Sequence, residues 1–165
     1  GDASLTQQFD QVRLNVLGRQ RSLPILQAEV SEMRAKMRHN HGTQITQGGL
    51  GRNAFNHDVQ FDLKQDAGGI VDIEFMVQYA VLAWSWQYPQ LVTYTDNIRI
   101  LDGLGAENLL NADHVRMLQE AYKAYRAAAH RLALQKQQGV VEGNLFVSER
   151  HAVMGVWQEL GLSYM

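Results

Sequence analysis

The 165-residue sequence contains no cysteine, which excludes a disulfide framework and any chemistry that needs a thiolate. It has only two prolines, so few positions interrupt a helix. Neither sign of charge is in large excess, because the formal net charge is −2, and no block of basic residues occurs. We therefore expect no nucleic-acid partner, since such proteins carry a basic face.

Long hydrophobic runs are absent as well. The longest apolar-rich run, residues 70–86, carries Asp72, Glu74, Gln78 and Ser85, and it is too polar and too short to span a bilayer. The start of the chain lacks the basic and apolar segments of a secretory signal. We expect no membrane partner and interpret the run as a buried helix. Because the chain begins with glycine in the middle of a helical pattern, we expect a fragment of a larger protein.

Apolar residues at helical spacing are abundant. Two sets recur at steps of four, three and four: Leu5, Phe9, Val12 and Val16, then Leu26, Val30, Met33 and Met37. This spacing predicts two amphipathic helices. Ser22 followed by Pro24 is typical of a helix start and marks the beginning of the second one.

Four further helices are predicted. Residues 69–87 are apolar on most faces, so we expect this helix at the centre. Thr95 is expected to cap a short helix that Gly105 closes, Asn111 to cap the longest helix, and Ser148 to cap the last one.

Residues 39–60 break the periodicity and are rich in glycine, asparagine and glutamine. We interpret them as a flexible loop in preference to a functional lid. Residues 61–64 have the character of a short extended piece. The predicted fold is all-α. Residues 1–165 form a single helical domain, a bundle of about six helices with one long Gly-rich loop and no substantial sheet.

The densest group of polar residues is "KQDAGGIVDIEF", residues 64–75. A two-metal site needs carboxylates that converge on one point. Asp72 and Glu74 are two residues apart in a helical pattern, where such side chains diverge by roughly 200°, so this pair alone is not expected to hold a metal. Gly68 and Gly69 permit a tight turn, and the unpaired amides of a helix start can bind phosphate, with Lys64 as counter-charge.

A structural interpretation competes with this one, because a carboxylate in the first turn of a helix stabilises it by about 0.3–1 kcal/mol. A composite site is a third possibility. Lys64, Asp66 and the two glycines would then lie on an exposed turn, and Asp72 or Glu74 would face another domain that completes an active site.

The segment "FDLKQDAGGIVDIEFMVQYAVL" resembles the helical domain that follows the catalytic core in bacterial glutamine synthetase adenylyltransferases, also called glutamate–ammonia-ligase adenylyltransferases. The stretches "LQAEVSEMRAKMR", "YTDNIRILDGLG" and "AYKAYRAAAHRLAL" resemble that family in the same order, so the similarity runs from about residue 5 to residue 160. Related uridylyltransferases carry a looser version of the motif, and the "DIEF" ending favours the adenylyltransferases.

The resemblance implies a nucleotidyltransferase of two halves. It would transfer AMP from ATP to a tyrosine of glutamine synthetase and remove it by phosphorolysis, under control of signal protein PII and glutamine. It also implies a cytoplasmic location, with ATP and Mg²⁺ as cofactors of the full-length enzyme. The Gly-Ser turn and Asp-x-Asp pair of the family's core are missing from this sequence. We therefore expect a helical companion of that core that is inactive alone and binds neither cofactor tightly.

The match to the family's motif covers Lys64, Gly68, Gly69, Asp72 and Glu74. It implies that Lys64, Asp72 and Glu74 line the active-site cleft, that Lys64 and both glycines contact the nucleotide, and that this chain has no complete catalytic set and no metal ligand. Either carboxylate would orient a metal-bound water or pair with an arginine of the core. Expected partners are glutamine synthetase, PII and the protein's own core. Two alternatives stay open: a non-catalytic docking module for glutamine synthetase or a regulatory protein, and the equivalent domain of a uridylyltransferase.

Overall fold

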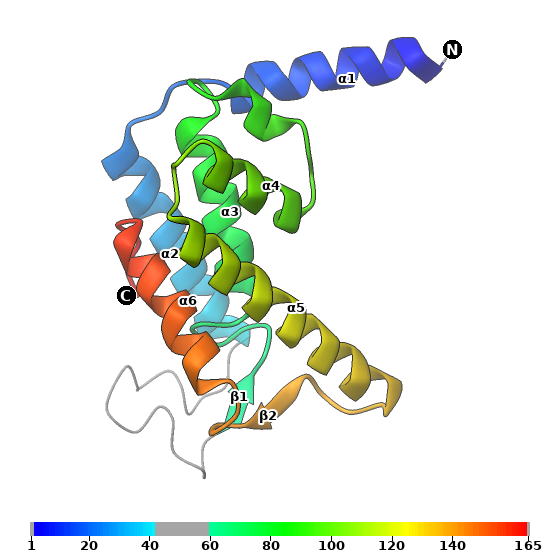
Figure 1. The fold of residues 1–165 in the computed structure, drawn as a ribbon, viewed down its shortest axis with the longest axis vertical. Coiled ribbons are helices and arrows are strands. Elements are labelled where there is room, and N and C mark those ends of the chain that lie inside the picture. The colour runs from blue at the N-terminus through cyan, green and yellow to red at the C-terminus, as the bar shows by residue number, and fades with distance from the viewer. Residues whose placement is uncertain (1, 42–59, 165) are drawn as a thin grey trace.

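The computed structural model describes residues 2–41 and 60–164, and within them the chain forms six α-helices (Figure 1). They are α1 (Asp2–Leu17), α2 (Leu23–His41), α3 (Ile70–Trp84), α4 (Asn97–Ala106), α5 (Ala112–Leu134) and α6 (Val147–Glu159). A 3₁₀ turn, η2 (Pro89–Val92), joins α3 to α4. The predicted all-α class is confirmed.

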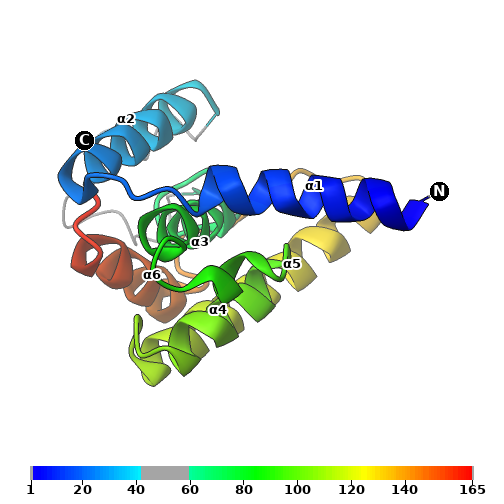
Figure 2. The same ribbon diagram turned by 90° about the horizontal axis from the view of Figure 1, so that it is seen from above.

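The most apolar helix, α3, lies at the centre as predicted. Figure 2 shows it surrounded by α2, α4, α5 and α6. Its buried residues are Ile70, Val71, Asp72, Ile73, Met76, Val77, Tyr79, Ala80, Val81 and Ala83. All of these except Val71 and Asp72 belong to a continuous hydrophobic core to which α4, α5 and α6 contribute their apolar faces. Among the described residues, no helix is long and apolar enough to cross a membrane.

A small antiparallel sheet was not predicted. Strand β1 (Gln60–Asp62) pairs with β2 (Val140–Glu142), and Phe61 lies opposite Val141. The extended character of residues 61–64 pointed to β1 in part, but three residues of β2 give no recognisable alternation. The sheet fixes the chain immediately before α3.

The ends of the predicted loop need correction. Residues 39–41 continue α2, and Gln60 already belongs to β1. The rest of the predicted loop, residues 42–59, lies outside the described residues.

The predicted helix caps are partly correct. Asn111 caps α5 through its side chain, as expected. The cap of α4 is Asp96 instead of Thr95, because the Asp96 carboxylate accepts a hydrogen bond from the amide three residues on. Ser148 lies inside α6, whose cap position is Phe146 in a left-handed conformation (φ 58°) without a side-chain hydrogen bond.

The two predicted amphipathic helices form, but their apolar stripes behave differently. In α2, Leu26 is buried, whereas Met33 is exposed and the charged Arg34 is buried in its place. In α1 no residue is buried at all.

Candidate functional site

The segment between β1 and α3 is a tight turn held by its own carboxylates. Asp62 Oδ1 accepts hydrogen bonds from the amides of Lys64 and Gln65, each at 2.9 Å. Asp66 Oδ2 accepts one from the amide of Asp62 at 2.8 Å. The expectation that Asp66 is exposed is wrong, because its side chain is needed inside the turn and is buried.

The four backbone amides from Gly68 to Val71, in the turn and at the start of α3, already have acceptors. We expected unpaired donors here, but the turn bends back and supplies acceptors, so this feature of the phosphate hypothesis is wrong. The hydrogen bonds run from Gly68 N to Asp72 Oδ2 (2.7 Å), Gly69 N to Asp66 O (3.0 Å), Ile70 N to Leu63 O (2.8 Å) and Val71 N to Lys64 O (3.1 Å).

The two glycines are required by close packing. Gly68 has φ +83°, and an added Cβ would lie 3.0 Å from the carbonyl oxygen of Arg150. An added Cβ on Gly69 would lie 2.6 Å from the carbonyl oxygen of Leu63. Both glycines are buried rather than exposed. Their positions support the structural interpretation of the Gly-Gly pair.

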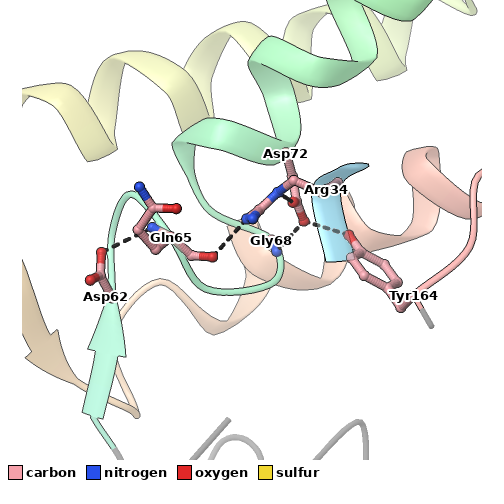
Figure 3. A network of polar contacts seen from close by, with 6 residues as sticks. All are labelled: Arg34, Asp62, Gln65, Gly68, Asp72 and Tyr164. Carbon is pink, nitrogen blue, oxygen red and sulfur yellow. Dashed lines mark hydrogen bonds and ion pairs between the residues drawn. The ribbon is translucent and has the colours of Figure 1, made fainter. Parts of the chain in front are cut away.

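Asp72 is the centre of a buried hydrogen-bond network (Figure 3). Its Oδ1 accepts from Arg34 Nε at 2.6 Å, and its Oδ2 accepts from the Tyr164 hydroxyl and the Gly68 amide, both at 2.7 Å. The Arg34 guanidinium also donates to the carbonyl of Gln65 at 2.6 Å. One carboxylate therefore ties α2, the turn and the C-terminal segment to the start of α3.

The surroundings of Asp72 are electrostatically unusual. Burial, followed by the negative charge of Asp72, raises the pKa of Tyr164 well above its ordinary value. The Arg38 guanidinium lies 5.3 Å from the centre of the Tyr164 ring, and burial lowers the pKa of Arg38. Burial also lowers the pKa of Arg150, which lies over the Phe61 ring at 4.0 Å. Asp72 and Arg150 are buried, whereas Arg38 is half-buried at the edge of the cluster.

Among the five motif residues, Lys64 alone is exposed and Glu74 is half-buried, while Asp72 and both glycines are buried. The predicted divergence of Asp72 and Glu74 is confirmed. Asp72 faces α2 and the C-terminal segment, whereas the negative charge of Glu74 is felt by Arg126 of α5. The pKa of Arg126 is raised, chiefly by its hydrogen bond to the Tyr122 hydroxyl and less by Glu74.

Asp72 does not reach outward to an arginine of another domain, because its arginine partner is Arg34 of this chain. Within residues 2–41 and 60–164, no three histidine or carboxylate side chains gather as a metal-ligand set. Of the five motif residues, only Lys64 and Glu74 reach solvent.

Two members of the network were missed in the sequence. Arg34 follows Leu26 and Val30 at steps of four, so a charge on an apolar helix face was a usable signal. Tyr164 carried no such signal, because it lies 92 residues from Asp72 along the chain.

A family profile described as GlnD PII-uridylyltransferase matches residues 31–158. The chain is 60% identical over 163 residues to a bifunctional glutamine synthetase adenylyltransferase/adenylyl-removing enzyme of Pseudomonas syringae pv. tomato. It is 62% identical over 154 residues to the protein of that name from Pseudomonas aeruginosa. These matches cover 99% and 93% of this chain, but the chain spans only 16% of either relative's length.

Proposed function

Because the chain belongs to the family described by the PII-uridylyltransferase profile, we propose that it is the helical part of a bifunctional glutamine synthetase adenylyltransferase/adenylyl-removing enzyme. The observation that carries this assignment is the identity of about 60% to two such enzymes over at least 93% of the chain. The full-length protein would transfer AMP from ATP to a tyrosine of glutamine synthetase and remove it again. PII as regulatory partner and a cytoplasmic location belong to the same proposal.

ATP and Mg²⁺ would be held mainly by the part of the polypeptide outside these 165 residues. The described residues gather no set of three metal ligands, so Mg²⁺, which neutralises phosphate charge when bound, is assigned to that other part. The role of this chain is to line the cleft from the helical side.

Lys64 is the residue best suited to meet the nucleotide. Its side chain is exposed at the turn before α3, while the backbone on either side is fixed by the carboxylates of Asp62 and Asp66. An ammonium group on a rigid turn is preorganised, so it stabilises phosphate charge without a large reorganisation of the protein. Gly68 and Gly69 contribute by closing this turn.

Asp72 acts in this proposal as a positioning residue. Its hydrogen bond to the Gly68 amide and its ion pair with Arg34 hold the turn against α2. Glu74, half-buried beside α5, is the carboxylate that remains available for a contact with the catalytic core.

The test is AMP transfer to glutamine synthetase by the full-length protein carrying Lys64→Ala. Loss of a preorganised charge at the transition state should lower kcat/KM by roughly tenfold or more, with unchanged thermal stability because Lys64 is exposed. Lys36→Ala is the matched control, since Lys36 is an exposed lysine of α2 whose ammonium group forms a surface ion pair with Glu32. Transfer at the wild-type rate in Lys64→Ala would refute the assignment of Lys64.

The description of the family profile favours one further candidate, transfer of UMP to PII by the same fold. Replacing ATP by UTP and glutamine synthetase by PII in the same assay separates the two. Labelled UMP on PII without labelled AMP on glutamine synthetase would overturn the adenylyltransferase proposal.

A further inference from the structure

One face of α1 is apolar and uncovered. Leu5, Phe9, Val12 and Val16 are 66%, 67%, 60% and 47% exposed. At the rise of an α-helix these four side chains form a stripe about 16 Å long. Scattered exposed apolar residues are normal, but a continuous stripe of this kind marks an interaction site.

The opposite face of α1 attaches the helix to the rest of the chain. Leu14 and Leu17 pack against the core, and they point roughly 110–170° away from the centre of the stripe. The Arg13 guanidinium donates to the carbonyl oxygens of Val92 and Tyr94. Figures 1 and 2 show that the N-terminal part of α1 extends away from the other helices. The stripe therefore remains free for a partner while the helix is fixed at its C-terminal end.

The extents of the matches to known proteins suggest what covers the stripe. The family profile begins at residue 31, after α1, whereas the match to the Pseudomonas syringae enzyme includes 163 of the 165 residues and so includes nearly all of α1. Thus α1 lies outside the unit that the profile describes but belongs to the long adenylyltransferases. Since the chain is only 16% of that relative, most of the polypeptide is available to cover the stripe.

We propose that the stripe of Leu5, Phe9, Val12 and Val16 docks on an apolar surface of the remaining part of the same polypeptide and thereby sets the orientation of the helical part. This inference rests on the proposed function only in requiring that the chain be a piece of the long enzyme. A stable contact between separate chains usually involves about 20–30 residues a side. Four side chains are few by that measure, but within one polypeptide the effective concentration is high and a small patch suffices.

The experiment is hydrogen exchange of the α1 amides in the full-length protein. The test variant is Leu5→Asp with Phe9→Asp, and the control is Gln7→Asp with Gln11→Asp. The control places the same residue at the same spacing on exposed positions outside the stripe. We expect protected amides in the wild type and in the control, and exchange at least about tenfold faster in the test variant.

Equal exchange in the two variants would overturn the proposal, as would wild-type amides that are unprotected. Protection that rises with protein concentration would show that a second copy covers the stripe. Protection that requires added glutamine synthetase would show that the substrate protein does so, and either result overturns the proposal. AMP transfer measured on the same samples distinguishes the two hypotheses. Protected α1 without transfer refutes the proposed function alone, and transfer with unprotected α1 refutes the docking alone.

Discussion

Replacement of Asp72 by asparagine tests whether the motif is organised around a buried anion. The substitution keeps the shape of the side chain but removes its charge. Arg34, whose side chain is 0% exposed, then loses the ion pair that Asp72 forms with its guanidinium. In addition, an amide nitrogen replaces one of the two oxygens that accept from Arg34, Gly68 and Tyr164.

The magnitude follows from the burial of both partners. Removing one partner of a fully buried ion pair leaves an uncompensated charge and costs about 3–5 kcal/mol. For a domain of 150–250 residues, each kcal/mol corresponds to about 2–4 °C in Tm, so we expect a decrease of roughly 6–20 °C. Arg34→Met combined with Asp72→Asn removes the orphaned charge. The double variant should therefore lose less stability than the sum of the single variants, by about 0.5–3 kcal/mol.

Urea unfolding of the 165-residue chain, followed by circular dichroism, measures all four proteins of this cycle. A cost below about 1 kcal/mol for Asp72→Asn would show that solvent reaches the carboxylate and that the network does not hold the turn. Strictly additive costs would show that Arg34 and Asp72 do not depend on each other.

Three further outcomes follow from the same structure. Gly69→Ala should cost about 1–3 kcal/mol because its Cβ would meet two carbonyl oxygens at 2.6 and 3.0 Å. Gly155→Ala has open space around its Cβ and should stabilise α6 by about 0.5–1 kcal/mol. Equal changes in Tm for the two variants would contradict this. The pKa of Tyr164 is raised in the folded state, so its contribution to the free energy of unfolding is complete below its unfolded pKa of about 10 and is lost as pH rises further. The free energy of unfolding measured in urea should therefore fall above pH 10. This fall should be less steep in Tyr164→Phe by up to about 1.4 kcal/mol per pH unit. An unchanged slope would refute the burial of that hydroxyl. Asp96→Ala should cost about 0.5–2 kcal/mol and Thr95→Ala under about 0.5 kcal/mol, and chemical denaturation giving the reverse order would place the cap of α4 at Thr95.

Residue spacing predicted the helices because helix formation depends on neighbours a few positions apart. The apolar run at 69–87 and the Asn111 cap are local signals, and both correspond to observed features of α3 and α5. The motif at 64–75 was also located by local signals, since a glycine pair before an apolar run predicts a turn followed by a helix. What these signals lacked was any information on which atoms the turn would contact.

The sequence by itself determined the fold class, the position of the central helix and the place of the candidate site. Only the tertiary structure decided that Asp72 points inward, because its partners Arg34 and Tyr164 lie 38 and 92 residues away. It likewise decided that the amides at the start of α3 are occupied and that the stripe of α1 is uncovered. Periodicity reports which face of a helix is apolar, but what lies against that face depends on contacts between distant segments.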